Sequence, residues 1–451
     1  MRKLSVVVIA LIAIMMWGSV ADAALMQFDD FIGECDCTIG GALRLRQEIY
    51  QNVYDLDSNA AGDTRDFFRL RANLWAKFAI TDYDAVFLGL VSEPRAYLYP
   101  ASLAAQDAVP RNYVMIDKLN FQLDEFMESP VSLKIGRQNL AGEYGEHFLI
   151  SDGTPCDGSR TNYFDALKAS VALTENETLD VLYIRNDKYD KKFLSDGAYK
   201  KQVNVNLYDE VGSVFYLKSN LSDELKAEAY WMNKVEKRSS TLKLNTLGAY
   251  AKYNAAERGT FRGQFAIQDG EQGNGSSKVD WSGWGGYLFW DKGFDGDLKP
   301  EVTIGGLFLS GDDPQTNNKI EGWNPLWSRF PYLNELYSYL LQTETAGVQG
   351  GSATGYWTNT ALFTARLTIT PMEKMSIAMA VDLIRAMEDS TAINSGDRTD
   401  KDKGLSPHIT LKYKFSPTVS FRTQLYAFEP GDFYDEQDTA FFIRHEWNIK
   451  F

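Results

Sequence analysis

Apolar and polar residues alternate along this chain with a period of two. In residues 65–81, Phe68, Leu70 and Leu74 share one face, while Arg69 and Arg71 lie on the other. A period of two kept over this length predicts an extended strand with one apolar and one polar face. Strands of soluble sandwiches are usually shorter. The same alternation recurs in residues 43–49, 225–231, 363–369, 409–415, 419–425 and 441–451.

The links between these strands alternate between short and long. Tight links are expected near residues 81–84, 128–130, 174–177, 220–223, 254–258, 292–297, 370–373 and 416–418. Many contain Pro, Gly, Asp or Asn, the usual turn residues. Longer polar links are expected near residues 53–64, 95–111, 139–159, 186–209, 234–240, 269–279, 311–356, 388–404 and 429–437. Outer-membrane barrels have this organisation, with short periplasmic turns and long extracellular loops.

We therefore predict an all-β fold, a transmembrane antiparallel β-barrel of about eighteen strands. A closed barrel has no edge, so residues 24–451 are expected to form a single domain. The longest link, residues 311–356, holds Trp323, Trp327 and a Tyr/Leu-rich stretch at 332–341. We expect a short helix there, and a loop that folds over or into the mouth of the barrel.

The two ends of the chain indicate where the protein goes. A basic start at Arg2 and Lys3, an apolar run to Trp17 and Ala21-Asp22-Ala23 match a secretory signal peptide covering residues 1–23. The apolar run is too short for a spanning helix. The last strand alternates aromatic residues and ends on Phe451, like the signal read by the barrel assembly machinery. We expect a location in the outer membrane of a Gram-negative-type bacterium, with outer-membrane lipid around the barrel.

Composition narrows the possible partners. The formal net charge of −15 argues against nucleic acid. Three cysteines, Cys35, Cys37 and Cys156, are too few for a disulfide scaffold, and whether any of them pair stays open. We expect no cofactor, although four loop carboxylates offer oxygen ligands for Ca²⁺, an alternative to plain solvated charge: Asp152, Asp157, Asp312 and Asp313.

Basic residues gather on the polar faces that should line the lumen. In a closed barrel the first strand pairs with the second and the last, which places six arginines on one wall: Arg44, Arg46, Arg69, Arg71, Arg422 and Arg444. Arg366 has the same parity in another strand. Guanidinium groups bind carboxylates through paired donors, so these residues are candidates for the lining of an anion channel. The competing interpretation is an Arg–Glu network that stiffens the wall, with Glu48, Glu228 and Glu446 as partners. Trp75, Tyr230 and Tyr426, also on polar faces, either stack on sugar rings or fill the lumen.

One stretch resembles a known family. Ile135-Gly136-Arg137-Gln138, the Gly142–Glu146 segment and the run from Ser151 to Ala166 resemble the alginate export family of outer-membrane porins. The resemblance implies a monomeric barrel with an electropositive pore for an anionic, alginate-like saccharide. It also implies that Arg137, Asp165 and Arg444 lie in the pore or at its mouth. Alternation puts Arg137 on the lipid side, so a pore position requires a bend or bulge there.

Other functions remain as alternatives. One is a general anion-preferring porin. Another is a plugged barrel that serves as a surface scaffold or adhesin, as the long aromatic loop would allow. A barrel hydrolase rests only on His147 beside Glu143 and Glu146, without the spacing of a catalytic triad. We expect a channel and no enzyme.

Overall fold

A computed structural model gives the fold. It describes residues 36–54, 56–60, 64–100, 114–140, 142–151, 163–190, 193–194, 203–204, 208–275, 277–328, 333–344, 356–389 and 400–451. The predicted signal peptide, Cys35, Cys156, Asp152 and Asp157 lie outside these residues, so those predictions stand untested. Cys37 is buried at the start of the first strand.

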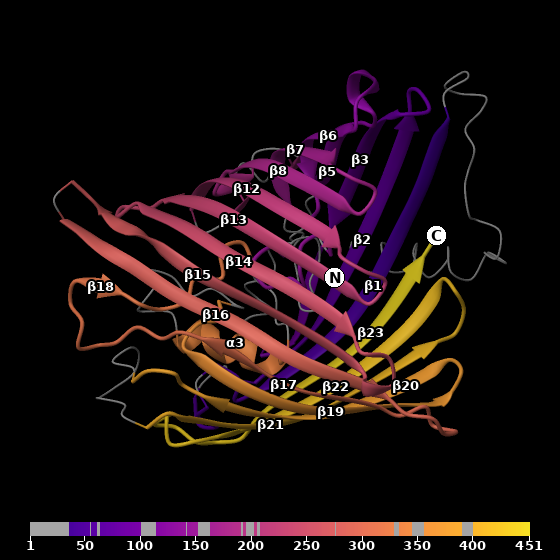
Figure 1. The fold of residues 1–451 in the computed structure, drawn as a ribbon. Helices are drawn as coiled ribbons and strands as arrows, with labels where there is room; N and C mark the ends of the chain where they lie inside the picture. Colours follow the sequence, from indigo (N-terminus) through magenta and orange to yellow (C-terminus); the bar gives the residue numbers. More distant parts are fainter. Residues whose placement is uncertain are drawn as a thin grey trace.

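The strands form one closed antiparallel ring (Figure 1). The first half of the ring contains β1 (Cys37–Gln51), β2 (Arg65–Ala79), β3 (Asp84–Ser92), β4 (Arg95–Tyr99), β5 (Val114–Leu123), β6 (Val131–Gln138), β7 (Phe164–Ala172), β8 (Glu177–Asn186), β12 (Asp209–Asn220) and β13 (Leu225–Lys237). The second half contains β14 (Leu242–Asn254), β15 (Thr260–Asn274), β16 (Ser277–Gly293), β17 (Glu301–Leu309), β19 (Thr360–Met372), β20 (Met375–Arg385), β21 (Asp402–Lys414), β22 (Val419–Pro430) and β23 (Ala440–Lys450). Because β3 and β4 both pair with β2 as one interrupted strand, the ring has eighteen strands, as predicted.

The ring closes where the two ends of the chain meet. β1 pairs with β2 on one side and with β23 on the other. Gly41 and Phe451 exchange backbone hydrogen bonds of 2.7 and 3.0 Å at this seam. The pairing of β1 with β23 therefore leaves neither terminal strand as an open edge.

Short elements fill some of the links. η1 (Phe126–Glu128) and η2 (Ala256–Arg258) lie in turns. β9 (Tyr189–Asp190), β10 (Phe193–Leu194), β11 (Val203–Asn204) and β18 (Lys319–Ile320) lie in loops at the opposite end. α3 (Glu335–Glu344) is the helix expected in the longest link. No helix within the described ranges is long and apolar enough to cross a membrane.

The alternation of short and long links is confirmed, with three corrections. β15 and β16 continue through the expected loop at 269–279 and are joined by residues 275–276. β13 extends to Lys237, which shortens the expected loop at 234–240 to residues 238–241. The expected loop that begins at Arg95 starts instead after β4.

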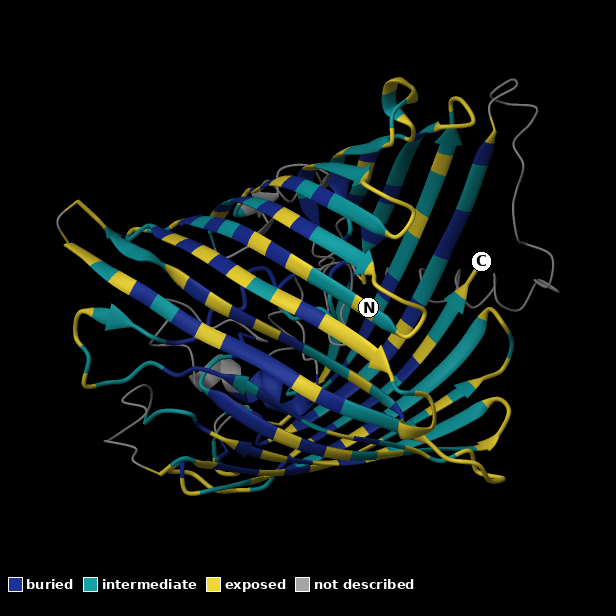
Figure 2. Ribbon diagram, in the orientation of Figure 1, coloured by how far each residue is buried: buried dark blue, intermediate teal, exposed yellow. Residues whose placement is uncertain are grey.

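The apolar residues of the alternating pattern lie on the outer face of the barrel, and the polar residues lie on the inner face. Exposed and buried positions take turns along the strands (Figure 2). Large apolar side chains on the outer face include Leu74, Leu247 and Ile304, each about half exposed at 48%, 57% and 51%. A continuous apolar outer surface is the surface that lipid covers in a membrane barrel. The polar parity faces the lumen.

Two long links turn inward and fill part of the lumen. Residues 140–150 (except 141), 323–327 and 333–340 contribute buried side chains to the same apolar cluster as the inward residues of the strands. α3 lies inside the ring, where its residues Leu336, Tyr337 and Leu340 are buried (Figure 1). The expected inward fold of the longest link is thus observed, and a second loop joins it.

Candidate channel lining

Six arginines gather on one wall of the lumen, across the seam of the barrel. We call the set Arg44, Arg46, Arg69, Arg71, Arg422 and Arg444 the arginine wall. Its strands are neighbours in the order β22, β23, β1 and β2. Register places Arg46 opposite Arg69 and Arg44 opposite Arg71. The predicted gathering of these residues is confirmed, because closure of the ring makes the first two and last two strands adjacent.

Like charges placed directly opposite destabilise a sheet, so this wall needs carboxylates between them. Glu48 is the carboxylate that three of these arginines share. Its oxygens lie 2.8 Å from Arg69 Nη1, 2.6 Å from Arg444 Nη2 and 3.7 Å from Arg46 Nη1. Glu446 accepts from Arg46 and lies 2.9 Å from Arg422 Nη2. The network interpretation therefore holds for Glu48 and Glu446, and the arginines are paired within the wall.

A third carboxylate comes from a broken strand. Glu93 lies in the gap between β3 and β4, and its Oε1 is 3.4 Å from both Arg44 Nη2 and Arg71 Nε. Pro94 follows it and has no N–H to donate to the sheet, which explains why the strand is interrupted here. The interruption delivers Glu93 to the wall, a role that the alternating pattern did not indicate.

The fourth carboxylate arrives on the long inward loop. Glu335, the first residue of α3, accepts a hydrogen bond from Arg444 Nη1 and another from Gln424 Nε2 at 3.3 Å. Asn334 caps the helix by accepting from Tyr337 N at 2.9 Å. The Asn334 amide also donates to Asp382 at 2.9 Å and to Ser406 at 2.8 Å. The start of α3 is thus held against β20–β23 by polar contacts.

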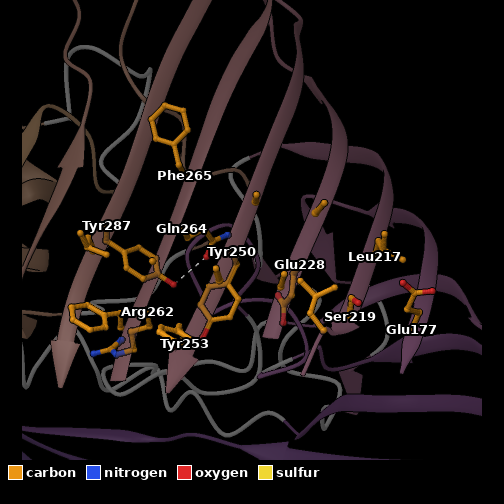
Figure 3. Close-up of a pocket in the computed structure, with 18 residues that line it drawn as sticks. Glu177, Leu217, Ser219, Glu228, Tyr250, Tyr253, Arg262, Gln264, Phe265 and Tyr287 are labelled. Atoms are coloured by element: carbon orange, nitrogen blue, oxygen red, sulfur yellow. Dashed lines mark hydrogen bonds between the residues drawn. The ribbon is translucent and has the colours of Figure 1, made fainter. Parts of the chain in front are cut away.

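The opposite wall is lined by tyrosines. We call the set Tyr216, Tyr230, Tyr250 and Tyr287, on β12–β16, the tyrosine wall. The rings of Tyr216 and Tyr230 stack at 5.1 Å. Gln264 joins two of the rings. It donates to Tyr230 Oη at 2.8 Å. It also accepts from Tyr287 Oη at 3.2 Å (Figure 3). Tyr230 is therefore a packed wall residue, as are Trp75, stacked on Phe87, and Tyr426, stacked on His408.

The shorter inward loop, residues 139–151, is anchored on the tyrosine wall and on the strands beside it. Glu146 accepts from Arg262 and from Tyr250 Oη. Glu143 accepts from Lys168. Glu228, one of the expected arginine partners, instead accepts from Tyr216 Oη and from the backbone N–H of Gly145. Both inward loops therefore present carboxylates to basic residues of the lumen.

The two loops meet inside the barrel. Trp327 N donates to Leu149 O at 3.0 Å, and Ser328 Oγ donates to His147 O at 2.8 Å. The rings of Phe148 and Trp323 stack at 5.0 Å. The two loops therefore contact each other inside the barrel.

Burial changes the acidity of several loop groups. It raises the pKa of Tyr144, whose hydroxyl donates to Asp180 at 2.9 Å. It lowers the pKa of His147, which favours the neutral imidazole. It raises the pKa of Asp312, which accepts from Glu321 N at 2.7 Å.

The three remaining site candidates lie apart from the arginine wall. Arg137 lies opposite Asp165 and Leu119 in register, and Leu119 is on the exposed outer face. Its guanidinium forms paired bonds of 2.9 and 3.0 Å to Asp165 and covers the ring of Tyr163 at 3.7 Å. Gly136, with φ of +115°, makes the backbone irregular here. The pairing with Leu119 gives Arg137 outward parity, but its side chain is only 5% exposed. Its place in the pore stays a prediction. Arg366 has inward parity in β19, separated from β22 by β20 and β21.

The groups considered for other chemistry are engaged elsewhere. Glu143 accepts from Lys168, and Glu146 accepts from Arg262. Asp313 accepts from Gln315 N at 2.9 Å, within its own loop. Among the described residues no group of three or more His, Cys, Asp or Glu is placed to hold a metal ion.

A groove of about 730 Å³ runs over β12–β16. Its lining includes the outward residues Ala229, Ala249, Ala251 and Leu288 together with atoms of the tyrosine wall behind them (Figure 3). Small outward side chains make the wall thin here. The groove belongs to the outer, lipid-facing surface.

A closed eighteen-stranded barrel with an apolar exterior and polar, charged interior defines the class of the protein: it is an outer-membrane channel of a Gram-negative-type bacterium, and not an enzyme. The family model described as "Alginate export" matches residues 37–443, and the chain belongs to this family. The expected family membership is confirmed.

Solved structures show the same fold. Pseudomonas aeruginosa OpdK with vanillate is 11% identical, with a TM-score of 0.57, and the match covers 92% of this chain and 98% of that one. P. aeruginosa OccK2 (OpdF) in complex with glucuronate is 11% identical, with a TM-score of 0.55 and the same coverage. P. aeruginosa OpdO is 13% identical, with a TM-score of 0.55, and the match covers 92% and 97%. Among curated proteins, none matches the chain in sequence.

Proposed function

We propose that this channel carries an acidic, alginate-like saccharide and that the arginine wall selects for its carboxylates. The observation that supports this most is the gathering of six guanidinium groups on one wall against four carboxylates, Glu48, Glu93, Glu335 and Glu446. A fixed excess of positive charge in a lumen of low dielectric attracts anions. A row of guanidinium forks lets a polyuronate exchange partners as it moves.

The family description and two structural relatives agree with this proposal. The family is described by alginate, a polymer of uronic acids, and by export. Two of the similar barrels were solved with carboxylates, vanillate and glucuronate. We propose export of a polysaccharide by a monomeric barrel. A general anion-preferring porin is the second candidate, since the same wall would attract any small anion.

Single-channel recording in a salt gradient tests the selectivity. The double variant Arg71→Gln/Arg422→Gln removes two wall charges but leaves Arg44 with Glu93 and Arg46 with Glu446. We expect wild-type protein to prefer anions and the permeability ratio of the variant to fall toward unity. A matched control is Lys243→Gln/Lys278→Gln, which removes two exposed charges paired with Glu271. Cation preference in wild-type protein, or equal selectivity in both double variants, would overturn the proposal.

Block by oligosaccharides separates the two candidates. We expect a trimer of uronic acid to block the conductance and a neutral trisaccharide of equal length to leave it open. A general anion porin would discriminate by charge alone, so a single uronic acid would then act as strongly as the trimer at equal carboxylate concentration.

The last strand supports a proposal about assembly. Phe441, Trp447 and Phe451 are exposed on the outer face of β23 and at the end of the chain. We propose that they are read by the barrel assembly machinery after export directed by residues 1–23. Deletion of Phe451 is expected to lower the amount of folded barrel in the outer membrane, measured by protease resistance. Unchanged insertion would contradict this.

A further inference from the structure

Each inward loop places a carboxylate on a basic group of the lumen. Glu335 of the longer loop contacts Arg444, and Glu146 of the shorter loop contacts Arg262. Both contacts join a loop to a strand rather than two neighbouring strands. A carboxylate is also the charged group that each sugar of a polyuronate carries. We propose that Glu335 and Glu146 occupy carboxylate-binding subsites of the channel, and that an acidic saccharide enters by taking their places. This inference rests on the proposed function.

Arg444 shows why the two kinds of partner differ. Its Nε and Nη2 face Glu48, on the adjacent strand and directly opposite in register, at 2.7 and 2.6 Å. Its Nη1 faces Glu335, and the Gln424 amide, 3.3 Å from the second oxygen of Glu335, completes a two-donor site. Glu48 belongs to a strand of the wall, whereas Glu335 is the buried first residue of α3, which the longer loop brings to the wall. The Nη1 side of Arg444 with Gln424 is therefore a preformed carboxylate site, and Glu335 is its resident occupant.

The second subsite repeats the arrangement on the other side of the lumen. Arg262 is held by the wall residue Asp291, which accepts from its Nε at 2.7 Å. Its Nη1 donates to Glu146 of the loop. Tyr250 Oη donates to the other oxygen of Glu146 at 3.3 Å. Again one wall carboxylate fixes the guanidinium, and a second donor helps it to bind the loop carboxylate.

The arrangement has a physical reason. A guanidinium group buried without its counter-charge is costly, so an empty channel needs a carboxylate at each subsite. A loop carboxylate supplies it and can be exchanged for that of a ligand without a change in local charge. The same loop carboxylate competes with the ligand and lowers its apparent affinity. Only a ligand with several carboxylates gains enough to displace both loop residues.

Binding of a uronic acid trimer to the purified, full-length barrel in detergent tests this directly. We expect Glu335→Gln and Glu146→Gln each to bind the trimer more tightly than wild-type protein, on the order of tenfold, because the internal competitor is removed. The matched control is Glu321→Gln. Glu321 lies in the longer loop but pairs with Lys319 of the same loop, at 2.8 Å, so its replacement should leave the affinity unchanged.

The outcomes separate this inference from the proposed function. Affinity that is unchanged or weaker in the folded variants, with trimer still bound by wild-type protein, overturns the exchange. If wild-type protein and all three variants fail to bind the trimer while conducting ions, the proposed substrate class fails instead. The two subsites lie on different loops, so a folding failure of one variant leaves the other to decide. Channel recording without ligand adds a second readout, in which we expect higher open probability for both variants and not for Glu321→Gln.

Discussion

The two inner walls of the barrel are built from different kinds of contact. On the arginine wall, Glu48 alone contacts Arg46, Arg69 and Arg444. On the tyrosine wall, stacked rings and neutral hydrogen bonds through Gln264 connect neighbours two at a time. Loss of a buried charge that several groups share leaves all of them uncompensated, which costs more stability than loss of one neutral hydrogen bond. A single substitution in the arginine wall should therefore weaken contacts across the whole wall. A single substitution in the tyrosine wall should weaken only the contacts of the residue that is replaced.

The largest expected effect is that of Glu48→Gln. The change leaves three buried guanidinium groups without their common carboxylate, and we expect a loss of stability of about 3–5 kcal/mol. The measurement is denaturant unfolding of the barrel in detergent, with Glu373→Gln in an exposed turn as the control. A loss no greater than the control's would mean that the wall does not depend on Glu48.

The next largest effect tests whether charge or location matters. Lys234 lies on β13 of the tyrosine wall but is itself fully buried between Glu210 and Glu236, at 3.0 and 2.7 Å. Lys234→Met should cost about 3 kcal/mol, because both buried carboxylates lose an ion pair, although Glu236 keeps its contact with Arg238. Denaturant unfolding of the barrel in detergent measures this cost as well. A cost as small as that of a neutral substitution on this wall would show that location, rather than charge, sets the response.

A smaller effect is expected for Tyr230→Phe. The substitution removes the hydroxyl that accepts from Gln264 but keeps the ring stacked on Tyr216. We expect a loss of about 1 kcal/mol, the usual contribution of a neutral hydrogen bond. Its combination with Glu48→Gln should be additive, since the residues share no contacts. A loss as large as that from Glu48→Gln would remove the contrast between the walls.

The smallest effect is expected outside both walls, where the loop after β1 contacts the loop before β23. Asp438 accepts from Ser58 N at 2.8 Å. Hydrogen bonds from the side chain and the backbone of Ser58 lower the pKa of its carboxyl group. A lowered folded-state pKa means that the contact stabilises above the unfolded value, about 3.9, and is lost as pH falls through the folded one. Amide exchange of Ser58 should be faster in Asp438→Asn than in wild-type protein at pH 6, and this difference should be smaller at pH 2. Equal exchange rates at both pH values would show that the contact has no ionic part.

Much of the fold could be predicted from the sequence because strand parity is local. Residues such as Arg69 and Leu70 show their faces through their immediate neighbours, and closure then makes β1 adjacent to β23. Parity alone also indicated the arginine wall. The hairpin at residues 269–279 was misread because its strands have little apolar alternation. There Gly270, Gly273 and Gly275 resemble a loop in composition.

Parity indicated two of the counter-charges, Glu48 and Glu446, but it could not indicate the other two. Glu93 reaches the wall because a strand breaks before Pro94, and Glu335 because a loop folds back over a long stretch of chain. Such contacts depend on tertiary packing and leave no periodic trace. For Arg137 the two lines of reasoning differ: the register opposite Leu119 agrees with the alternation, whereas the family resemblance implied the pore, which stays a prediction.

The charged residues at the seam between β1 and β23 also help to fix the register of these two strands. In the observed register Arg46 faces Glu446 and Glu48 faces Arg444. A slip of two residues in one direction would oppose Arg46 to Arg444, and in the other direction Glu48 to Glu446. Both misalignments keep the apolar residues outward, so hydrophobic pattern alone would not reject them. The like charges that each slip would bring together disfavour both, at the pairing that joins the first and final strands of the chain.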